Sequence, residues 1–251
     1  MNAAAALDAV VLDVGGTLVR LDYEWISLML AGLGVPATAA ELRVAEIRGR
    51  LAYDAAAAPP AAPAGAAQAV GTLPAIRAYW VGLLEAAGCP PDRLEDAVRR
   101  LDDRQRSDHF LWARPMEGAR ETLDRLAAMG LRLGCVSNSD GRAEAHLERF
   151  GLREGLEFVI DSAKVGVEKP DPRIFEMALR RLGVQPGRAL YVGDLRSVDE
   201  HGSRLAGMRF VLLDPDGSYA RGGTANITGI DRLPEYVAEH FTTPPGRAPR
   251  G

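Results

Sequence analysis

Residues 9 to 17 read Ala9-Val10-Val11-Leu12-Asp13-Val14-Gly15-Gly16-Thr17. Four apolar residues lead to an acid, and two glycines follow shortly after it. A short, continuous apolar run is typical of a strand that is buried on both faces of a parallel sheet, and the glycines predict a tight turn behind it. The sequence therefore predicts a buried parallel strand with Asp13 at its carboxyl end.

The chain after Pro115 alternates between strand-like and helical segments. Strands are predicted over residues 131–136, 158–160, 189–192 and 210–213, and helices over 118–129, 142–150, 172–182 and 197–206. For the helix over 172–182, Asp171 is a natural N-cap, Pro172 suits the first turn and Gly183 ends the helix. The alternation predicts an α/β fold with a doubly wound, Rossmann-like parallel sheet.

The segment between the first strand and this alternating part has helical spacing only. Helices are predicted over residues 23–33, 41–56, 73–87 and 93–106, with a flexible Ala/Pro/Gly-rich insertion at 59–71. We therefore expect an α/β core formed by residues 1–19 and 112–251, and a small all-helical domain formed by residues 20–111. Residues 242–251 are expected to be a disordered tail.

Composition excludes several classes of protein. The formal charge of -4 gives no basic field for nucleic acid. No apolar run approaches the roughly 20 residues that span a bilayer, and residues 1–7 lack the basic start of a signal peptide. The two cysteines, Cys89 and Cys135, are typical of a reduced cytoplasmic protein, and Cys135 is expected to be a buried, inert thiol. The sequence indicates a cytoplasmic protein and does not indicate its oligomeric state.

Lysine is rare in this chain. Of 30 basic residues only Lys164 and Lys169 are lysines, and the others are arginines. Genomic base composition explains an excess of arginine, but it does not explain why both lysines fall within one short segment. This placement indicates a specific role for a lysine there.

Four motifs resemble those of the haloacid dehalogenase superfamily, in the order that the family has them. They read Asp13-Val14-Gly15-Gly16-Thr17-Leu18, then Cys135-Val136-Ser137-Asn138, then Val165-Gly166-Val167-Glu168-Lys169-Pro170-Asp171-Pro172, then Tyr191-Val192-Gly193-Asp194 with Asp199 five residues on. Each motif is weak alone, but four in order with matching strand context form a strong signal. The resemblance covers nearly the whole chain, and the helical segment is similar to the small C1-type cap of subfamily I.

The resemblance implies a magnesium-dependent phosphatase that acts on a small phosphorylated metabolite. Asp13 would attack phosphorus and form an aspartyl-phosphate. Lys169 would neutralise the phosphate and the charge of Asp13. Asp194 would bind Mg²⁺ together with Asp13 and the backbone carbonyl of Gly15. Asp199 would orient the metal or Lys169.

The resemblance also implies residues that bind the substrate. Ser137 would donate a hydrogen bond to a phosphoryl oxygen, and further candidates for substrate binding are Thr17, Asn138 and Arg196. Plainer interpretations stay open at this stage: a turn-capping Asp13, a helix start signal at Ser137, a helix-capping Asp199, and Lys164 in place of Lys169.

One position departs from the family pattern. Phosphatases of the family normally carry a second Asp two residues after the nucleophile, as general acid and base, and here that position is Gly15. Such a carboxylate contributes roughly 100- to 10,000-fold to the rate. Glycine still has the backbone carbonyl that binds magnesium in the family, so a metal site is still expected.

Other functions remain as alternatives. Gly15 favours a catalytically weak or inactive member that binds a phosphorylated ligand or a protein partner. A haloacid dehalogenase would use Asp13 on carbon without magnesium, and the acids Asp194 and Asp199 argue against it. A phosphonatase would need a lysine in the helical segment, which has none. A sugar kinase of the actin-like fold would need a β-hairpin after the first strand and a second glycine-rich loop.

Overall fold

The computed structural model of the chain describes residues 5–57, 73–219 and 223–246. The insertion predicted at 59–71 lies outside these residues. The chain divides into two compact units, the first formed by Met1–Val19 with Pro115–Gly251 and the second by Arg20–Arg114.

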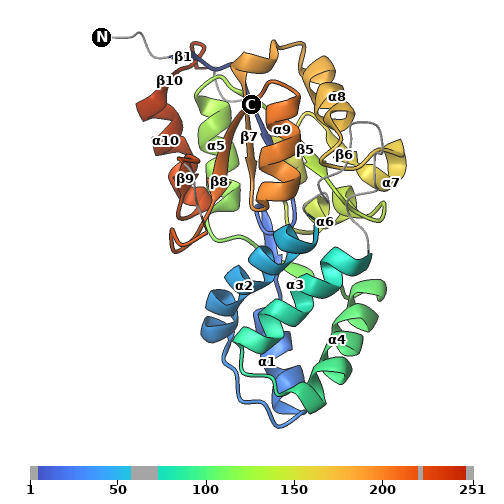
Figure 1. Ribbon diagram of the computed structural model, residues 1–251. Coiled ribbons are helices and arrows are strands. Elements are labelled where there is room, and N and C mark those ends of the chain that lie inside the picture. The colour runs from blue at the N-terminus through green and yellow to red at the C-terminus, as the bar shows by residue number, and fades with distance from the viewer. Residues whose placement is uncertain (1–4, 58–72, 220–222, 247–251) are drawn as a thin grey trace. The chain divides into compact units, whose positions relative to one another are not determined.

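A six-stranded parallel sheet forms the centre of the first unit, with the order β6-β5-β2-β7-β8-β9 (Figure 1). The strands are β2 (Ala9–Leu12), β5 (Arg132–Ser137), β6 (Val159–Asp161), β7 (Ala189–Gly193), β8 (Arg209–Leu213) and β9 (Asn226–Ile227). All four residues of β2 are buried, as expected for a strand covered on both faces. The parallel-sheet α/β class predicted from the sequence is confirmed.

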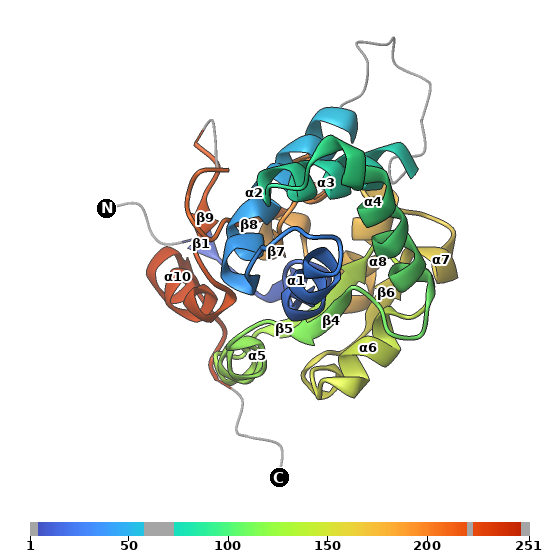
Figure 2. The same cartoon turned by 90° about the horizontal axis from the view of Figure 1, so that it is seen from below.

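Helices cover both faces of this sheet. They are α5 (Ala119–Ala128), α6 (Ala143–Arg149), α7 (Ser162–Val165), α8 (Pro172–Leu182), α9 (His201–Leu205) and α10 (Leu233–His240). Helix α5 packs against α10, and α8 against α9; Figure 2 shows α5 and α10 on the other side of the sheet from α8. The ends of α8 are as predicted, because the Asp171 carboxylate accepts a hydrogen bond from the Arg173 N–H and Gly183 is left-handed (φ 61°).

The register of the sheet sets which residues lie at its carboxyl edge. Leu12 pairs with Cys135 on one side and with Val192 on the other. Asp13 continues this alignment, since its backbone N–H donates to the Val192 carbonyl at 2.9 Å. The ends of three adjacent strands, β2, β5 and β7, therefore meet at one level, the edge at which ligands bind in doubly wound sheets.

Five short strands are not predicted by the sequence pattern. Besides β9, they are β1 (Ala5–Ala6), β3 (Val19–Leu21), β4 (Trp112–Pro115) and β10 (Phe241–Thr242); β1 pairs with β10, and β3 with β4. β3 contradicts the expectation that residues 20–111 contain no strand, although it is not part of the six-stranded sheet. β10 contradicts a disordered tail from Thr242, and residues 247–251 lie outside the described ranges. Strands this short show no readable alternation.

The described part of the second unit is built from helices α1 (Tyr23–Ala31), α2 (Ala39–Ala57), α3 (Leu73–Ala86) and α4 (Pro91–Arg106). Helices α2 and α3 pack along each other. Buried Glu46 of α2 accepts hydrogen bonds from the hydroxyls of Tyr23 in α1 and Tyr79 in α3, the latter at 2.5 Å, so one carboxylate joins three helices. Across the described ranges, no helix of either unit has the length and apolarity to cross a membrane.

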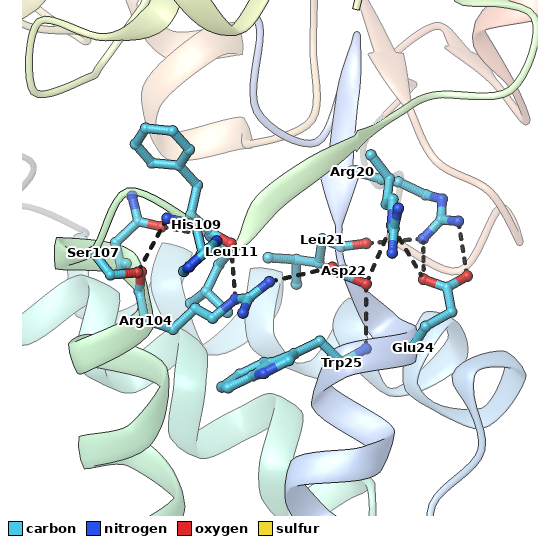
Figure 3. A network of polar contacts seen from close by, with 12 residues as sticks. Arg20, Leu21, Asp22, Glu24, Trp25, Arg104, Ser107, His109 and Leu111 are labelled. Atoms are coloured by element: carbon cyan, nitrogen blue, oxygen red, sulfur yellow. Dashed lines mark hydrogen bonds and ion pairs between the residues drawn. The ribbon is translucent and has the colours of Figure 1, made fainter. Parts of the chain in front are cut away.

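Asp22 holds the first residues of this unit beside its last ones (Figure 3). Its carboxylate caps α1 by accepting the Trp25 N–H at 3.2 Å. It also accepts hydrogen bonds from Arg104 at 3.4 Å and from Arg114 at 3.3 Å. The backbone N–H of Asp22 donates to the Leu111 carbonyl at 2.8 Å. The charge of this buried acid is therefore balanced by two guanidinium groups.

Candidate active site

Lys169 is the centre of a buried charge cluster at the carboxyl edge of the sheet. Its side chain is 3% exposed, and its ammonium donates to Asp13 Oδ1 at 2.6 Å and to Asp199 Oδ1 at 2.7 Å. Burial by itself would lower the pKa of Lys169, but the charges of Asp13 and Asp199 outweigh it and raise that pKa above its usual range. Lys169 is therefore charged at neutral pH.

Asn138 fixes the backbone of this lysine. The Lys169 N–H donates to Asn138 Oδ1 at 2.7 Å, and Asn138 Nδ2 donates to the Lys169 carbonyl at 2.9 Å. The sequence predicts a substrate contact for Asn138, but both ends of its amide are engaged here, so the geometry favours a positioning role instead. Lys164 is half exposed, with its ammonium 3.9 Å from Glu144 Oε2. Lys169, and not Lys164, is the lysine at Asp13.

Asp199 orients Lys169 and the loop after β7. One of its oxygens accepts a hydrogen bond from the Lys169 ammonium. The other accepts hydrogen bonds from the backbone N–H groups of Asp194 at 3.1 Å and Leu195 at 3.0 Å. Gly193 makes this approach possible, because a Cβ at that position would lie 2.4 Å from Asp199 Cγ. Both oxygens have donors. Of the two roles expected for Asp199, the geometry therefore favours orienting the lysine over orienting a metal.

The carboxylates of Asp13, Asp194 and Asp199 gather at one point. All three are buried, and one oxygen from each lies within 4.8 Å of the others. The Asp194 carboxylate lies against Gly16, where φ is 76° and a Cβ would meet Asp194 Oδ2 at 2.1 Å, so the turn requires glycine there. Burial, opposed by the charge of Lys169, raises the pKa of Asp13 to about 6. The cluster thus sets three acidic side chains around one ammonium.

The donor set at this point fits Mg²⁺. Because both oxygens of Asp199 accept hydrogen bonds from the protein, Asp13 and Asp194 are the acids that would hold a metal. In the turn after Asp13, the Val14 carbonyl accepts backbone hydrogen bonds from Leu18 and Val19, and the Gly16 N–H donates to the Val19 carbonyl. The Gly15 carbonyl takes no part in these hydrogen bonds. Two carboxylates and a carbonyl are hard oxygen ligands of the kind that Mg²⁺ prefers. The residues that would hold the ion are therefore Asp13, Gly15 and Asp194.

Three further candidates differ in how well their surroundings suit a ligand. Ser137 is the last residue of β5 and is buried. Thr17 is also buried, and within the described part of the chain its hydroxyl has no hydrogen-bond partner. Arg196 Nε instead donates to Glu200 at 3.0 Å, four residues on. This ion pair engages the side chain for which a substrate contact is predicted.

Comparison with known protein families decides the identity of the fold. The profile of the haloacid dehalogenase-like hydrolases matches residues 7–202, and that of the HAD-hydrolase-like family matches residues 167–243. The chain is a haloacid dehalogenase-like hydrolase. The superfamily predicted from the four motifs is thus confirmed.

Relatives of this HAD-like hydrolase match it over part of their length. Haloacid dehalogenase-like hydrolase domain-containing protein 3 of Mus musculus is 46% identical over 107 residues, 43% of this chain and 42% of the mouse protein. Glyceraldehyde 3-phosphate phosphatase of Methanothermobacter thermautotrophicus is 36% identical over 123 residues, 49% of this chain and 54% of that protein. The crystal structure of a HAD phosphatase from Thermococcus onnurineus superposes with a TM-score of 0.54 at 24% identity, over 94% of this chain and 100% of that one. The chain thus spans only about half or less of the length of the mouse and Methanothermobacter proteins. The similarity to the Thermococcus structure shows the fold.

Two buried residues of the HAD-like site are missed by the sequence analysis. The Tyr191 hydroxyl accepts a third hydrogen bond from Lys169, at 3.1 Å. The Asp161 carboxylate accepts the backbone N–H groups of Gly141 at 3.0 Å and Ala143 at 3.1 Å, which fixes the loop after β5. Both had a signal in the sequence. Tyr191 carries the one polar side chain of its strand, where a buried hydroxyl needs a partner, and Asp161 ends a strand as Asp13 does.

The two lysines offer a matched pair of stability tests. Replacing Lys169 with Met leaves Asp13 and Asp199 buried without their cation, so we expect the free energy of unfolding to fall by about 3 to 5 kcal/mol. Lys164→Met removes an exposed pair and should change that free energy by less than about 1 kcal/mol. Urea unfolding of both variants measures the difference. Equal losses would show that the buried cluster contributes no more than a surface pair.

The Lys169→Met deficit should also depend on pH. Without the ammonium, the pKa of Asp13, already raised by burial, rises further in the folded state. The folded state then binds more protons than the unfolded state at mildly acidic pH, so stability increases as the pH falls. The deficit should therefore be smaller at about pH 5.5 than at about pH 8.

Proposed function

We propose that this HAD-like hydrolase is a magnesium-dependent phosphatase that acts on a small phosphorylated metabolite through an aspartyl-phosphate at Asp13. The observation that carries the proposal is the Lys169 ammonium, held between Asp13 at 2.6 Å and Asp199 at 2.7 Å. Phosphoryl transfer needs chiefly a positioned nucleophile and positive charge against an anionic ester, and this cluster provides both. The phosphatase activity in the name of the Methanothermobacter relative supports the same class.

Each residue of the cluster has a part in this proposal. Asp13 attacks phosphorus, and the ester oxygen leaves. Lys169 holds the Asp13 carboxylate by one oxygen and offsets the repulsion between that carboxylate and the phosphate. The hydroxyls of Ser137 and Thr17 donate to phosphoryl oxygens. Bound Mg²⁺ would supply further positive charge at the transferring group. We assign the helical unit, Arg20–Arg114, as the cap that selects the substrate.

Gly15 narrows the expected substrates. No carboxylate stands at the position from which the family's phosphatases protonate the leaving oxygen. Aryl and acyl phosphates leave without much help from a proton, whereas alkyl phosphates need it. We therefore expect weak activity on activated phosphate esters and almost none on sugar phosphates.

An assay with an aryl phosphate, with and without Mg²⁺, tests the proposal. The expected result is slow, Mg²⁺-dependent release of phosphate, and a panel of metabolite phosphates then searches for the natural substrate. A chain that binds Mg²⁺ but hydrolyses no phosphate ester would contradict the phosphatase proposal.

Gly15 also favours a second function, binding of a phosphorylated ligand or protein partner without turnover. For such a protein, calorimetry would detect the binding of phosphate esters, and an assay would detect no release of phosphate. A haloacid dehalogenase is a weaker candidate, because a reaction on carbon leaves Asp194, buried beside Asp13, without a task. Incubation with a 2-haloacid and a halide assay would detect it.

Magnesium binding should be measurable without turnover. Adding Mg²⁺ to the wild-type chain should raise its melting temperature, because an ion that binds only the folded state stabilises that state. Asp194→Asn should remove most of this increase, while Asp216→Asn, in an exposed loop, should leave it unchanged. Since the pKa of Asp13 is raised to about 6, protons compete with the metal, and more Mg²⁺ should be needed at about pH 5.5 than at about pH 8. Equal shifts in all three proteins would place the ion elsewhere.

A further inference from the structure

Tyr191 lies in the middle of β7 with its side chain completely buried. Its ring meets the Phe175 ring edge-on, with 4.9 Å between the centroids. The strand is otherwise Ala, Leu, Val and Gly, so the hydroxyl is the one polar side-chain group that it places in the core. A buried hydroxyl is costly unless both its donor and its acceptor functions are used.

The direction of both hydrogen bonds at this hydroxyl follows from its neighbours. Lys169 Nζ lies 3.1 Å from Tyr191 Oη, and Tyr191 Oη lies 3.0 Å from the Val136 carbonyl. An ammonium donates and never accepts, and a carbonyl accepts and never donates. Tyr191 therefore gives its one hydrogen to Val136 and turns its lone pair toward Lys169.

The ammonium of Lys169 has three hydrogens, and three oxygens surround it. Two belong to acids, Asp13 and Asp199, and the third is the neutral Tyr191 hydroxyl. A third acid would compete with Asp13 for the ammonium, whereas a neutral oxygen completes the coordination and leaves the two ion pairs unchanged. The Val136 carbonyl fixes that oxygen from β5, one residue before Ser137.

We propose that Tyr191 is a positioning residue, which holds the third N–H of Lys169 and thereby sets the direction of the Lys169–Asp13 ion pair. The inference rests on the proposed function, since it gives Asp13 and Lys169 their parts in phosphoryl transfer. Tyr191, in β7, contacts the Val136 carbonyl in β5 and the Lys169 ammonium, and that ammonium contacts Asp13, which follows β2. The hydroxyl thus connects three strands of the sheet. Tyr191 is not among the residues proposed to touch the substrate or the metal, so we expect its hydroxyl to affect kcat more than the affinity for substrate.

The test is Tyr191→Phe, which keeps the ring and its contact with Phe175 and removes one oxygen. We expect kcat on an aryl phosphate to fall about 10-fold, as for other residues that orient a reacting group from behind. KM and the Mg²⁺ concentration for half-maximal activity should stay within about twofold of wild type, because no group that meets substrate or metal is removed. Tyr236→Phe is the control, since that ring stacks on His240 in α10 and is not part of the cluster.

The scarcity of lysine gives a second readout that needs no activity. Isotope labelling of lysine produces two ammonium signals in NMR, one from Lys169 and one from Lys164, which serves as the internal reference. All three N–H groups of Lys169 have protein acceptors, so its ammonium in the wild-type chain should exchange slowly with water. In Tyr191→Phe the Lys169 signal should shift and exchange faster, and the Lys164 signal should not change.

The two readouts separate the failure of this inference from the failure of the proposed function. A Lys169 signal that is the same in Tyr191→Phe and wild type overturns the inference, whatever the activity. A shifted signal with unchanged kcat also overturns it, because the hydroxyl would then not matter to the reaction. A wild-type chain that hydrolyses no phosphate ester overturns the phosphatase proposal, and with it the catalytic part of the inference. If Tyr191→Phe does not fold, the wild-type exchange rate decides: a Lys169 ammonium that exchanges as fast as that of Lys164 overturns the inference.

Discussion

Replacing Asp13 with Asn is expected to abolish the hydrolysis of every phosphate ester, a loss on the order of 10,000-fold or more. The amide keeps the shape of the side chain but has no anionic oxygen to attack phosphorus. It also removes the acid that Lys169 contacts at 2.6 Å and one of the two carboxylates that would hold a metal. Three contributions to one step are lost through a single substitution.

Asp8→Asn provides the matched control for this experiment. Asp8 directly precedes strand β2, and Asp13 directly follows it. The partly exposed carboxylate of Asp8 pairs with Arg188. We expect the control to keep wild-type activity. Acid quenching of a reaction with labelled substrate should trap a phosphoprotein in the wild type and none in Asp13→Asn. Label that is trapped equally in both proteins would place the nucleophile at another residue.

Regular periodicity made most of the fold predictable. Helix α8 is predicted with its bounds, Pro172–Leu182, because its cap, its first-turn proline and its terminal glycine each act locally. The unpredicted pair β1–β10 joins residues 5–6 to 241–242, and nothing in either dipeptide indicates a partner so distant in the chain. Helix α10 is likewise not predicted. The helix predicted over 197–206 is present as a π-helical turn, Arg196–Glu200, followed by α9, and only its π geometry has no signal in the sequence. Cys135 is a buried thiol as expected, and burial raises its pKa.

The candidate site was predictable where it depends on backbone topology. Asp13, Ser137 and Asp194 follow from the rule that parallel strands end at one edge. The rarity of lysine indicated a role for Lys164 or Lys169, and the resemblance to the family motif favoured Lys169. Contacts that depend on which way a side chain turns were not predictable: Asn138 faces the Lys169 backbone, and Arg196 turns to Glu200. A sequence motif names residue types, and it carries no information on rotamers.

Replacing Gly15 with Asp should have the opposite effect to Asp13→Asn and raise the turnover of alkyl phosphates. The variant restores a carboxylate at the position where the family's phosphatases carry their general acid and base. Such a group is worth roughly 100- to 10,000-fold, and the gain should be far smaller on aryl phosphates, which leave without a proton. The left-handed residue of this turn is Gly16 (φ 76°), and Gly15 is not among the described glycines with positive φ, so a side chain at Gly15 does not require a left-handed backbone.

The adjacent glycine makes the experiment specific. Gly16→Asp adds the same side chain one residue later, but its Cβ would lie 2.1 Å from Asp194 Oδ2, so it should disrupt the cluster and lower activity on every ester. The measurement compares kcat/KM for an aryl phosphate and a sugar phosphate in wild type and both variants, at matched folded fraction. A gain confined to Gly15→Asp and to the sugar phosphate would show that the wild-type chain lacks only its proton donor. Efficient hydrolysis of sugar phosphates by the wild type would show instead that another group already protonates the leaving oxygen. Inactivity of all three proteins would favour the binding function, because adding the missing acid accelerates only a site that already transfers phosphate.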